Sequence, residues 1–263
     1  GKWIATNSTG AESPAAYFSF DSNTGWMKNA SAYNSDYQSW MWKRGAGFDV
    51  VTYKGNGIGG KQIPHSLGII PEMIWLKYRS PSGYNEDWQV YHKGLNGGSN
   101  LGHYSIRLDS SSSQYGPSAN DWNNTAPTST HFTIGSDGRN NRDGSSYMTM
   151  LFASVSGISS LGSYTGNATD SDHSSGTKTV TFGFQPRMVI IKSYDANGEW
   201  GVLDTTRGWA SGSGNTKRLR LNLTNAQNNE DAGYPTSTGM VLTGSGSGLT
   251  NYSGQNYIYY AHA

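Results

Sequence analysis

The sequence predicts an all-β protein of tandem antiparallel β-sandwich repeats, jelly-roll-like in character and preceded by half a repeat. Three observations predict this fold: the composition, short runs with the periodicity of strands, and an internal duplication. Only 14% of the 263 residues are charged, whereas 13% are aromatic and 35 residues are Gly. Helices favour Ala, Leu, Glu and Lys, so this mixture instead suits short strands joined by tight turns. The 9 Trp and 17 Tyr residues indicate a buried core.

The second half of the chain repeats the order of motifs in the first half. Each copy carries a Tyr-x-Gly-Asn turn, a Met-x-x-x-Lys strand, an acidic-Trp-x-Val segment, an Ile/Leu-Arg-Leu segment, a Pro-Thr-Ser-Thr turn and a closing aromatic strand. The matching ranges are 53–56 and 164–167, 73–77 and 188–192, 87–90 and 199–202, 106–108 and 219–221, 127–130 and 235–238, and 147–153 and 257–263. Such extended self-similarity predicts one β unit duplicated at residues 47–155 and 156–263.

The first part of the chain, residues 1–46, matches the C-terminal half of the same unit. Residues 21–27 align with 235–241, and the aromatic run 37–43 (YQSWMWK) aligns with the strand that closes each full copy. We therefore expect half a β-sandwich repeat followed by two complete repeats. Its front half would come from upstream sequence or from a strand of a different partner.

The runs within each unit have the periodicity of strands. The apolar runs at 73–76 and 188–191 are bounded by Pro and Lys, which fits a buried strand. Residues 219–223 alternate Leu with polar residues, so one face of this strand should be buried and the other solvated. Because Gly-rich turns separate such strands, each unit is expected to form an antiparallel sandwich.

Several function classes are excluded by composition. The chain has no Cys, which removes disulfides and Cys-ligated zinc. Its net charge is +1, and the densest basic run, 217–220, is too short for the cationic stripe that nucleic-acid binding requires. No apolar run approaches the roughly 20 residues that span a bilayer. We therefore expect neither a nucleic-acid nor a membrane partner.

Catalytic, metal and cofactor sites are not predicted. The six His residues are isolated from one another in sequence. The oxygen-rich stretches 137–144 and 170–172 lack the spacing of known calcium loops and are better explained as turns. Asp87 and Glu199 could suggest a glycosidase pair, but they occupy equivalent positions in the two copies. A side chain that recurs in both copies serves the architecture of the unit, and the chain is not expected to be an enzyme.

The aromatic residues divide into two groups. Trp88 and Trp200 recur in both copies and are predicted to pack in the core. Four others have no clear counterpart and lie in or near variable loops; they are Tyr84, Tyr115, Trp122 and Trp209. Exposed aromatic rings in polar loops can stack on sugar rings, so these four are candidate contacts to a receptor or glycan. The alternative is that each is a local packing plug.

One combination of motifs resembles a known family. It comprises the run WKRxxGFDVVxYxGNG at 42–57, the Gly-x-x-Pro-x-Met-x-x-x-Lys strand, the acidic-Trp-x-Val segment and the Pro-Thr-Ser-Thr turn. Together these are similar to the duplicated β domains of uncharacterised tailed-phage virion proteins, common in cyanophages and other marine phages. The resemblance extends over nearly the whole chain and implies a tail-fibre-like structural role without catalytic residues.

On this basis we expect a phage virion structural protein, in a tail fibre or related appendage, that contributes to attachment to the host surface. Its partners would be other virion proteins, a host-surface glycan or receptor, and further copies of itself, as a trimer by analogy. One alternative is a capsid decoration or cement protein. A carbohydrate-active enzyme with a jelly-roll fold is a third hypothesis, which replacement of Asp87 or Glu199 would test.

Overall fold

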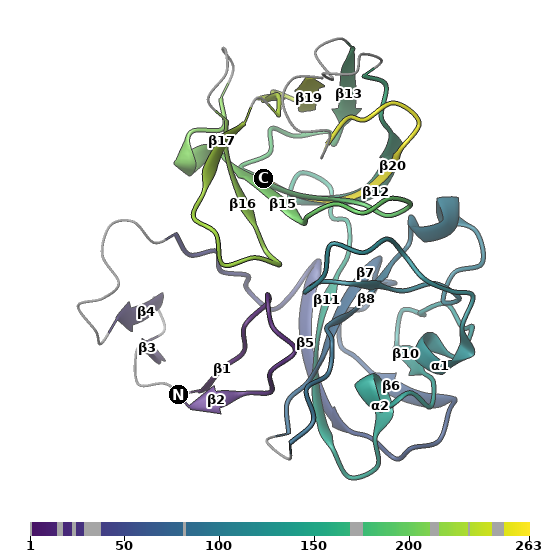
Figure 1. The fold of residues 1–263 in the computed structure, drawn as a ribbon. Coiled ribbons are helices and arrows are strands. Elements are labelled where there is room, and N and C mark those ends of the chain that lie inside the picture. Colours follow the sequence, from purple (N-terminus) through teal and green to yellow (C-terminus); the bar gives the residue numbers. More distant parts are fainter. Residues whose placement is uncertain are drawn as a thin grey trace.

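The fold is all-β, as predicted, and every ladder between named strands in the computed structural model is antiparallel (Figure 1). The structure describes residues 2–14, 18–22, 25–28, 38–80, 83–168, 176–210, 216–230, 232–243 and 250–263. Within these residues the helices are single turns: η1 (Leu95–Gly98), α1 (Ala119–Trp122), α2 (Gly138–Asn141) and η2 (Thr205–Arg207). No helix in the described part of the chain is long and apolar enough to span a bilayer.

The first repeat pairs a large sheet with a small one. The large sheet has the order β5 (Phe48–Lys54), β11 (Ser146–Phe152), β7 (Met73–Tyr78), β8 (Gln89–His92), β9 (Ile106–Arg107). The small sheet joins β6 (Lys61–Pro64) to β10 (His131–Ile134). Apolar side chains between the two sheets form the core of this sandwich, with Ile74, Leu76, Phe132 and Leu151 among them.

The second repeat has the same arrangement with two additional strands. Its large sheet has the order β12 (Ser159–Thr165), β20 (Asn256–His262), β14 (Met188–Ser193), β15 (Gly201–Asp204), β16 (Thr216–Arg220), β17 (Asn228–Glu230). Its small sheet has the order β13 (Thr177–Thr181), β19 (Gly239–Thr243), β18 (Tyr234–Thr236). The strand order β5-β11-β7-β8-β9 therefore matches β12-β20-β14-β15-β16.

The registers of the two large sheets also agree, which fixes residue-by-residue equivalences. Tyr147 lies opposite Tyr53 in the first repeat, and Tyr257 lies opposite Tyr164 in the second. Two tyrosine rings stack at each of these places, with centroids 5.1 Å and 5.0 Å apart. The duplicated motifs of the sequence thus occupy equivalent positions in two copies of one topology.

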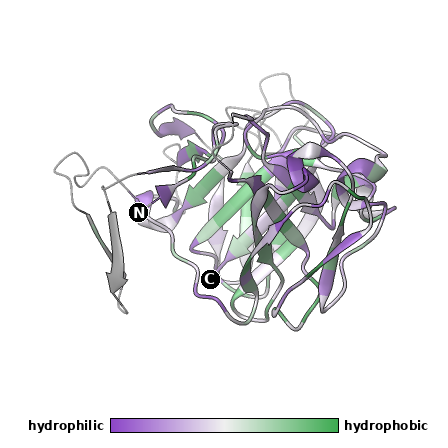
Figure 2. Cartoon of the chain, turned by 90° about the horizontal axis from the view of Figure 1, so that it is seen from below, coloured by the Kyte–Doolittle hydropathy of each residue, from purple (hydrophilic) through white to green (hydrophobic). Residues whose placement is uncertain are grey.

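A third core joins the repeats. Each large sheet contributes to it the face that points away from its own small sheet, which we call the inner face of that sheet. This shared core contains Phe48, Met73, Trp75, Trp88, Val90, Leu95, Ile106, Leu108 and Phe152 from the first repeat, and Leu161, Met188, Ile190, Tyr194, Trp200, Val202, Ile258 and Tyr260 from the second. Figure 2 shows the hydrophobic segments gathered on strands in the interior. All six residues of β7 and of β14 are buried. Their continuous apolar runs follow from burial on both faces.

The N-terminal region forms two small ladders beside the sandwiches. The first joins β1 (Lys2–Trp3) to β2 (Ser13–Pro14), and the second is a hairpin of β3 (Phe18–Ser22) and β4 (Gly25–Lys28). The hairpin places Ser22 opposite Gly25, which matches the pairing of Thr236 with Gly239 at the β18–β19 turn. The alignment of 21–27 with 235–241 is thus reflected in the register of the two turns.

The expected strand at 37–43 is not formed: residue 37 lies outside the described residues, and residues 38–43 belong to no strand. In the full repeats the corresponding strands β11 and β20 are central, each paired with a neighbour on both sides. No strand in the described part of the chain pairs with 38–43. Trp40 and Trp42 of this segment instead pack against the shared core. We refer to residues 2–14 and 38–46 together as the N-terminal arm.

Candidate functional site

An apolar pocket of about 630 Å³ lies where the N-terminal arm meets the two repeats. We call it the junction pocket. Repeat 1 lines it with Val50, Thr52, Trp75, Arg79, Trp88, Met148 and Met150; repeat 2 with Met188, Ile190, Val202 and Leu221; and the arm with Lys2, Trp3, Ile4, Thr6, Glu12, Trp40 and Trp42. Most of these side chains are apolar, and pockets of this size and character commonly bind ligands in proteins.

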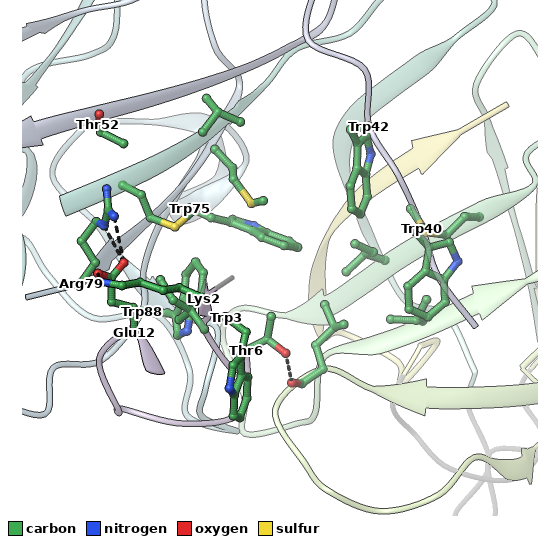
Figure 3. Close-up of a pocket in the computed structure, with 18 residues that line it drawn as sticks. Lys2, Trp3, Thr6, Glu12, Trp40, Trp42, Thr52, Trp75, Arg79 and Trp88 are labelled. Atoms are coloured by element: carbon green, nitrogen blue, oxygen red, sulfur yellow. Dashed lines mark hydrogen bonds and ion pairs between the residues drawn. The ribbon is translucent and has the colours of Figure 1, made fainter. Parts of the chain in front are cut away.

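The walls of the junction pocket come from opposite directions. In Figure 3, Thr52, Arg79 and Trp88 stand on one side of the pocket, and Trp40 and Trp42 stand on the other. The repeat-1 wall is the inner face of β5 and β11, because alternate residues of a strand point to the same side of its sheet. Glu12 forms ion pairs with Lys2 and Arg79, with N···O distances of 2.6 Å and 2.9 Å respectively.

One part of the arm is held by hydrogen bonds to its backbone. Trp88 donates from Nε1 to the carbonyl of Ala5 at 2.9 Å, and Lys77 donates from Nζ to the carbonyl of Ser8 at 3.1 Å. Thr6 donates its hydroxyl to the carbonyl of Leu221 in the second repeat at 2.9 Å. These contacts fix residues 5–8 between the repeats at the edge of the pocket.

The other part of the arm is anchored by two tryptophans. Trp42 packs against the rings of Phe48 and Phe152, and its Nε1 donates to the hydroxyl of Tyr260 at 2.9 Å. Trp40 donates from Nε1 to the Asp204 carboxylate at the end of β15. Trp40 and Trp42 are two residues apart, and both pack against the shared core.

Two buried lysines recur at equivalent positions in the two repeats. Lys77 also donates to the carbonyl of Glu86 at 2.6 Å, and Lys192 donates to the carbonyls of Ser111 and Gly198 at 2.9 Å and 2.6 Å. Burial lowers the pKa of each amine to about 8. Each ammonium therefore serves as a multiple donor to backbone carbonyls, which is a structural role.

The carboxylates that could suggest a glycosidase also have structural partners in each repeat. Asp87 forms an ion pair with Arg107 at 3.0 Å, and Glu199 accepts a hydrogen bond from Asn222. Burial, followed by the charge of Asp87, raises the pKa of Asp109 to about 6. None of these side chains lines the junction pocket.

Metal binding finds no support among the described residues, where no three His, Asp or Glu side chains form a group that could hold an ion. In the stretch 137–144, Asp137 caps α2 through the backbone N–H of Arg139 and pairs with the Arg139 guanidinium at 2.7 Å. This is the turn-forming role predicted for that stretch. The second oxygen-rich stretch, 170–172, lies outside the described residues.

Two of the four candidate glycan contacts are buried, so the surface-contact hypothesis is wrong for them. Trp122 is 2% exposed and donates from Nε1 to the Ser105 hydroxyl at 2.8 Å. Trp209 is 1% exposed and donates from Nε1 to the carbonyl of Gly233 at 3.0 Å. Each indole fills the core between the large and the small sheet of its own repeat. Both are packing plugs.

The other two candidates are at least partly accessible, although neither lies in the junction pocket. Tyr115 is half-buried and donates its hydroxyl to Gln89, with the guanidinium of Arg107 5.2 Å from its ring centroid. Tyr84 is 47% exposed, and the Arg142 guanidinium lies 3.6 Å from its ring centroid. Tyr84 is therefore the most exposed of the four candidates, with one face of its ring covered by Arg142.

Trp88 and Trp200 are buried in the shared core, which confirms their predicted packing role. The junction pocket itself was not predicted from the sequence, because its walls come from three parts of the chain. The one available signal was the alternation of Trp40 and Trp42, which indicated two indoles on the same side of an extended segment.

The fold and this pocket define a class: an all-β protein of two sandwiches with a shared core and an N-terminal arm docked against it. The chain belongs to the family described as a domain of unknown function (DUF7483), whose model matches residues 2–263. The match includes the arm and both repeats. Neither the curated proteins nor the solved structures contain a match to this chain.

Proposed function

We propose that the chain is a structural protein of a phage virion, in a tail fibre or related appendage, and that it contributes to attachment to the host surface. The observation that carries this proposal is the shared core. Because the inner faces of both large sheets are buried together, the repeats form one rigid body and are not two domains joined only by a linker. A rigid unit of this kind is suited to transmit position and load along an appendage.

The surface of the chain is consistent with the same role. With a net charge of +1 and few charged residues, the protein has little long-range attraction for charged partners. The polar groups that recur inside the repeats hold backbone segments together and require no substrate. The proposal is therefore non-enzymatic, and its partners are other virion proteins and further copies of the chain, with a trimer as the expected assembly.

The location of the protein on the particle tests the proposal. Antibodies against the purified chain, applied to particles of a phage that carries it, should label tail appendages in electron micrographs. Label over the head would support the alternative of a capsid decoration protein. Particles without label would overturn the virion proposal altogether.

The attachment component has a separate test at Tyr84, the exposed aromatic candidate. Purified protein should compete with phage for adsorption to host cells, and Tyr84→Ala should reduce that competition. Ile58→Ala is the matched control, because Ile58 is also exposed, at 69%, and lies elsewhere on repeat 1. If Tyr84→Ala and Ile58→Ala compete as well as the unmodified chain, Tyr84 is not a receptor contact.

A further inference from the structure

The segment at the end of β8 in repeat 1 contacts repeat 2, and the equivalent segment of repeat 2 contacts the N-terminal arm. His92, at the end of β8, hydrogen-bonds through Nε2 to the carbonyl of Tyr259 in β20, at 3.2 Å. Gly94 then passes so close to repeat 2 that an added Cβ would lie 2.9 Å from Ser163 Cβ and 3.1 Å from Ile258 Cγ2. Repeat 1 thus covers the inner face of β12 and β20 with the segment that follows β8.

Repeat 2 makes the corresponding contact with the N-terminal arm. Asp204 ends β15 as His92 ends β8, since each lies opposite the first Met of the neighbouring strand. Its carboxylate accepts the hydrogen bond from Trp40. Trp40 aligns with Tyr260 of β20, one residue beyond the carbonyl that His92 contacts. The arm therefore occupies the place of a closing strand in a third unit.

A second set of contacts runs in the opposite direction. In repeat 2, Trp200 Nε1 donates to the carbonyl of Arg107 at 2.8 Å, and Lys192 donates to the carbonyl of Ser111. This pair holds the end of β9 and the segment that follows it. In repeat 1, the equivalent Trp88 and Lys77 hold residues 5–8 of the arm. The arm thus also supplies the segment that follows a β9-type strand.

Among the residues that the structure describes, these relations form a cycle in which one contact is missing. Repeat 1 contacts repeat 2, repeat 2 contacts the arm, and the arm should contact repeat 1 through a strand of the β8 type. The face of repeat 1 that such a strand would cover is the inner face of β5 and β11. Its residues are equivalent by register to the covered face of repeat 2: Val50 to Leu161, Thr52 to Ser163, Met148 to Ile258, and Met150 to Tyr260. All four repeat-1 residues line the junction pocket.

We propose that the junction pocket is the docking site for a β-hairpin of the repeat's own β7–β8 type, supplied by another polypeptide segment. Its chemistry is an apolar strand ending in Lys, followed by an acidic-Trp-x-Val strand. The apolar side chains enter between Met150 and Ile190, and the Trp and Lys face the segment after β16, where the Leu221 carbonyl now accepts the Thr6 hydroxyl. This inference rests on the internal repeat and is independent of the proposed virion function.

A folded second copy of the chain does not meet this requirement. Its β7 lies between β11 and β8, and its β14 lies between β20 and β15, so both hairpins are already central in their own sheets. All residues of β7 and β14 are buried there. The occupant is therefore a hairpin of this sequence type that is not part of a complete repeat.

Titration of the complete chain with a labelled synthetic peptide tests the proposal. The probe has the sequence of residues 188–204, MVIIKSYDANGEWGVLD. We expect saturable 1:1 binding by fluorescence anisotropy. A peptide with Ala at the Lys192 and Trp200 positions should bind about tenfold or more weakly.

Two variants of the protein locate the binding. Val50→Arg places a cation in the pocket wall and should reduce affinity by about tenfold or more. Ile158→Arg is the matched control at an exposed position, and it should bind as the unmodified chain does. Thermal unfolding checks that each variant is folded, and Trp3→Ala, at a half-exposed rim position, replaces Val50→Arg if that variant does not fold. Absence of peptide binding, equal binding of the two peptides, or equal binding by pocket and control variants would each overturn the proposal.

Discussion

The two repeats share one topology but have different neighbours. Repeat 2 has the inner face of β12 and β20 covered by repeat 1, whereas the equivalent face of repeat 1 lines the junction pocket. The residues at equivalent positions differ in the same way. Gly94 lies against Ser163, but the equivalent Thr206 in repeat 2 is exposed. The comparison teaches that the shared topology determines where the strands lie in both repeats. The neighbouring unit determines which side chains fit on the faces and edges of each repeat.

The largest expected effect separates the two core tryptophans. Trp200→Ala should reduce the free energy of unfolding by about 4 kcal/mol, because it opens a cavity between the repeats and leaves the Arg107 carbonyl without its donor. Trp88→Ala should cost about 3 kcal/mol, since Trp88 already borders the pocket and its cavity can merge with that space.

Urea denaturation measures both values. Hydrogen exchange provides a second readout, because Trp88→Ala removes the donor to Ala5 and should increase exchange in residues 2–14, which Trp200→Ala should leave unchanged. A larger loss of stability for Trp88→Ala than for Trp200→Ala would contradict the view that repeat 2 is the more completely enclosed unit.

The next effect concerns His92, whose equivalent in repeat 2 is Asp204. Burial lowers the pKa of His92 to about 3, so the folded protein keeps the imidazole neutral while the unfolded chain binds a proton below its ordinary pKa of 6.5. Stability from this group is therefore lost as the pH falls from 6.5 toward 3. Between pH 6.5 and pH 4 the loss is about 3 kcal/mol.

His92→Gln isolates this contribution, because an amide can still donate to the Tyr259 carbonyl but does not titrate. Urea denaturation at pH 7 and pH 4 should show a smaller acid loss for the variant than for the unmodified chain. Parallel pH profiles would mean that His92 is not the acid-sensitive group between the repeats.

A third comparison changes Gly94 and Thr206 to the same residue. Gly94→Ala should destabilise the protein by about 1–3 kcal/mol, because its methyl group would overlap Ser163 and Ile258 in the neighbouring repeat. Thr206→Ala should change stability by less than about 0.5 kcal/mol, since this side chain is exposed. Thermal unfolding of the two variants provides the measurement. Equal effects would show that contact with a following unit does not distinguish the two positions.

Much of the fold was predictable from sequence, because the signals are local and occur twice. The runs 73–77 and 188–192 predicted strands, and the recurrence of Trp88 and Trp200 predicted their burial. The strand at 37–43 was predicted wrongly, because a central strand requires ladder partners that its own sequence does not reveal. Local pattern identifies a segment that can form a strand, whereas pairing depends on the rest of the sheet.

The candidate site was less predictable. Trp122 and Trp209 were candidate surface contacts, with local packing as the alternative, because they lie near variable loops and have no clear counterpart in the other copy. The structure places both between the large and small sheets. Different segments thus supply an indole that fills the core of each repeat. The junction pocket depends on how three distant segments meet, and no motif within any one of them encodes that geometry.

The smallest effect concerns Asp109 and Asn222, which accept a hydrogen bond from the backbone N–H of Trp88 and Trp200, respectively. In repeat 2 the amide of Asn222 also donates to Glu199, but in repeat 1 the buried Oδ2 of Asp109 has no partner. Asp109→Asn should allow the new amide to donate to Asp87, which is equivalent to Glu199. We expect a gain of about 1 kcal/mol at pH 7, after allowance for partial solvent screening and for the lost attraction to Lys77.

The pH dependence of this gain gives the decisive test. Because the pKa of Asp109 is raised to about 6 from 3.8, its carboxylate disfavours folding above pH 6, and this cost disappears as the pH falls below about 4. The advantage of Asp109→Asn in urea denaturation should therefore vanish at pH 4, and Asn222→Asp should destabilise repeat 2 at pH 7. A gain that is independent of pH would assign the effect to packing, and the difference between the two repeats at this position would then not be one of charge.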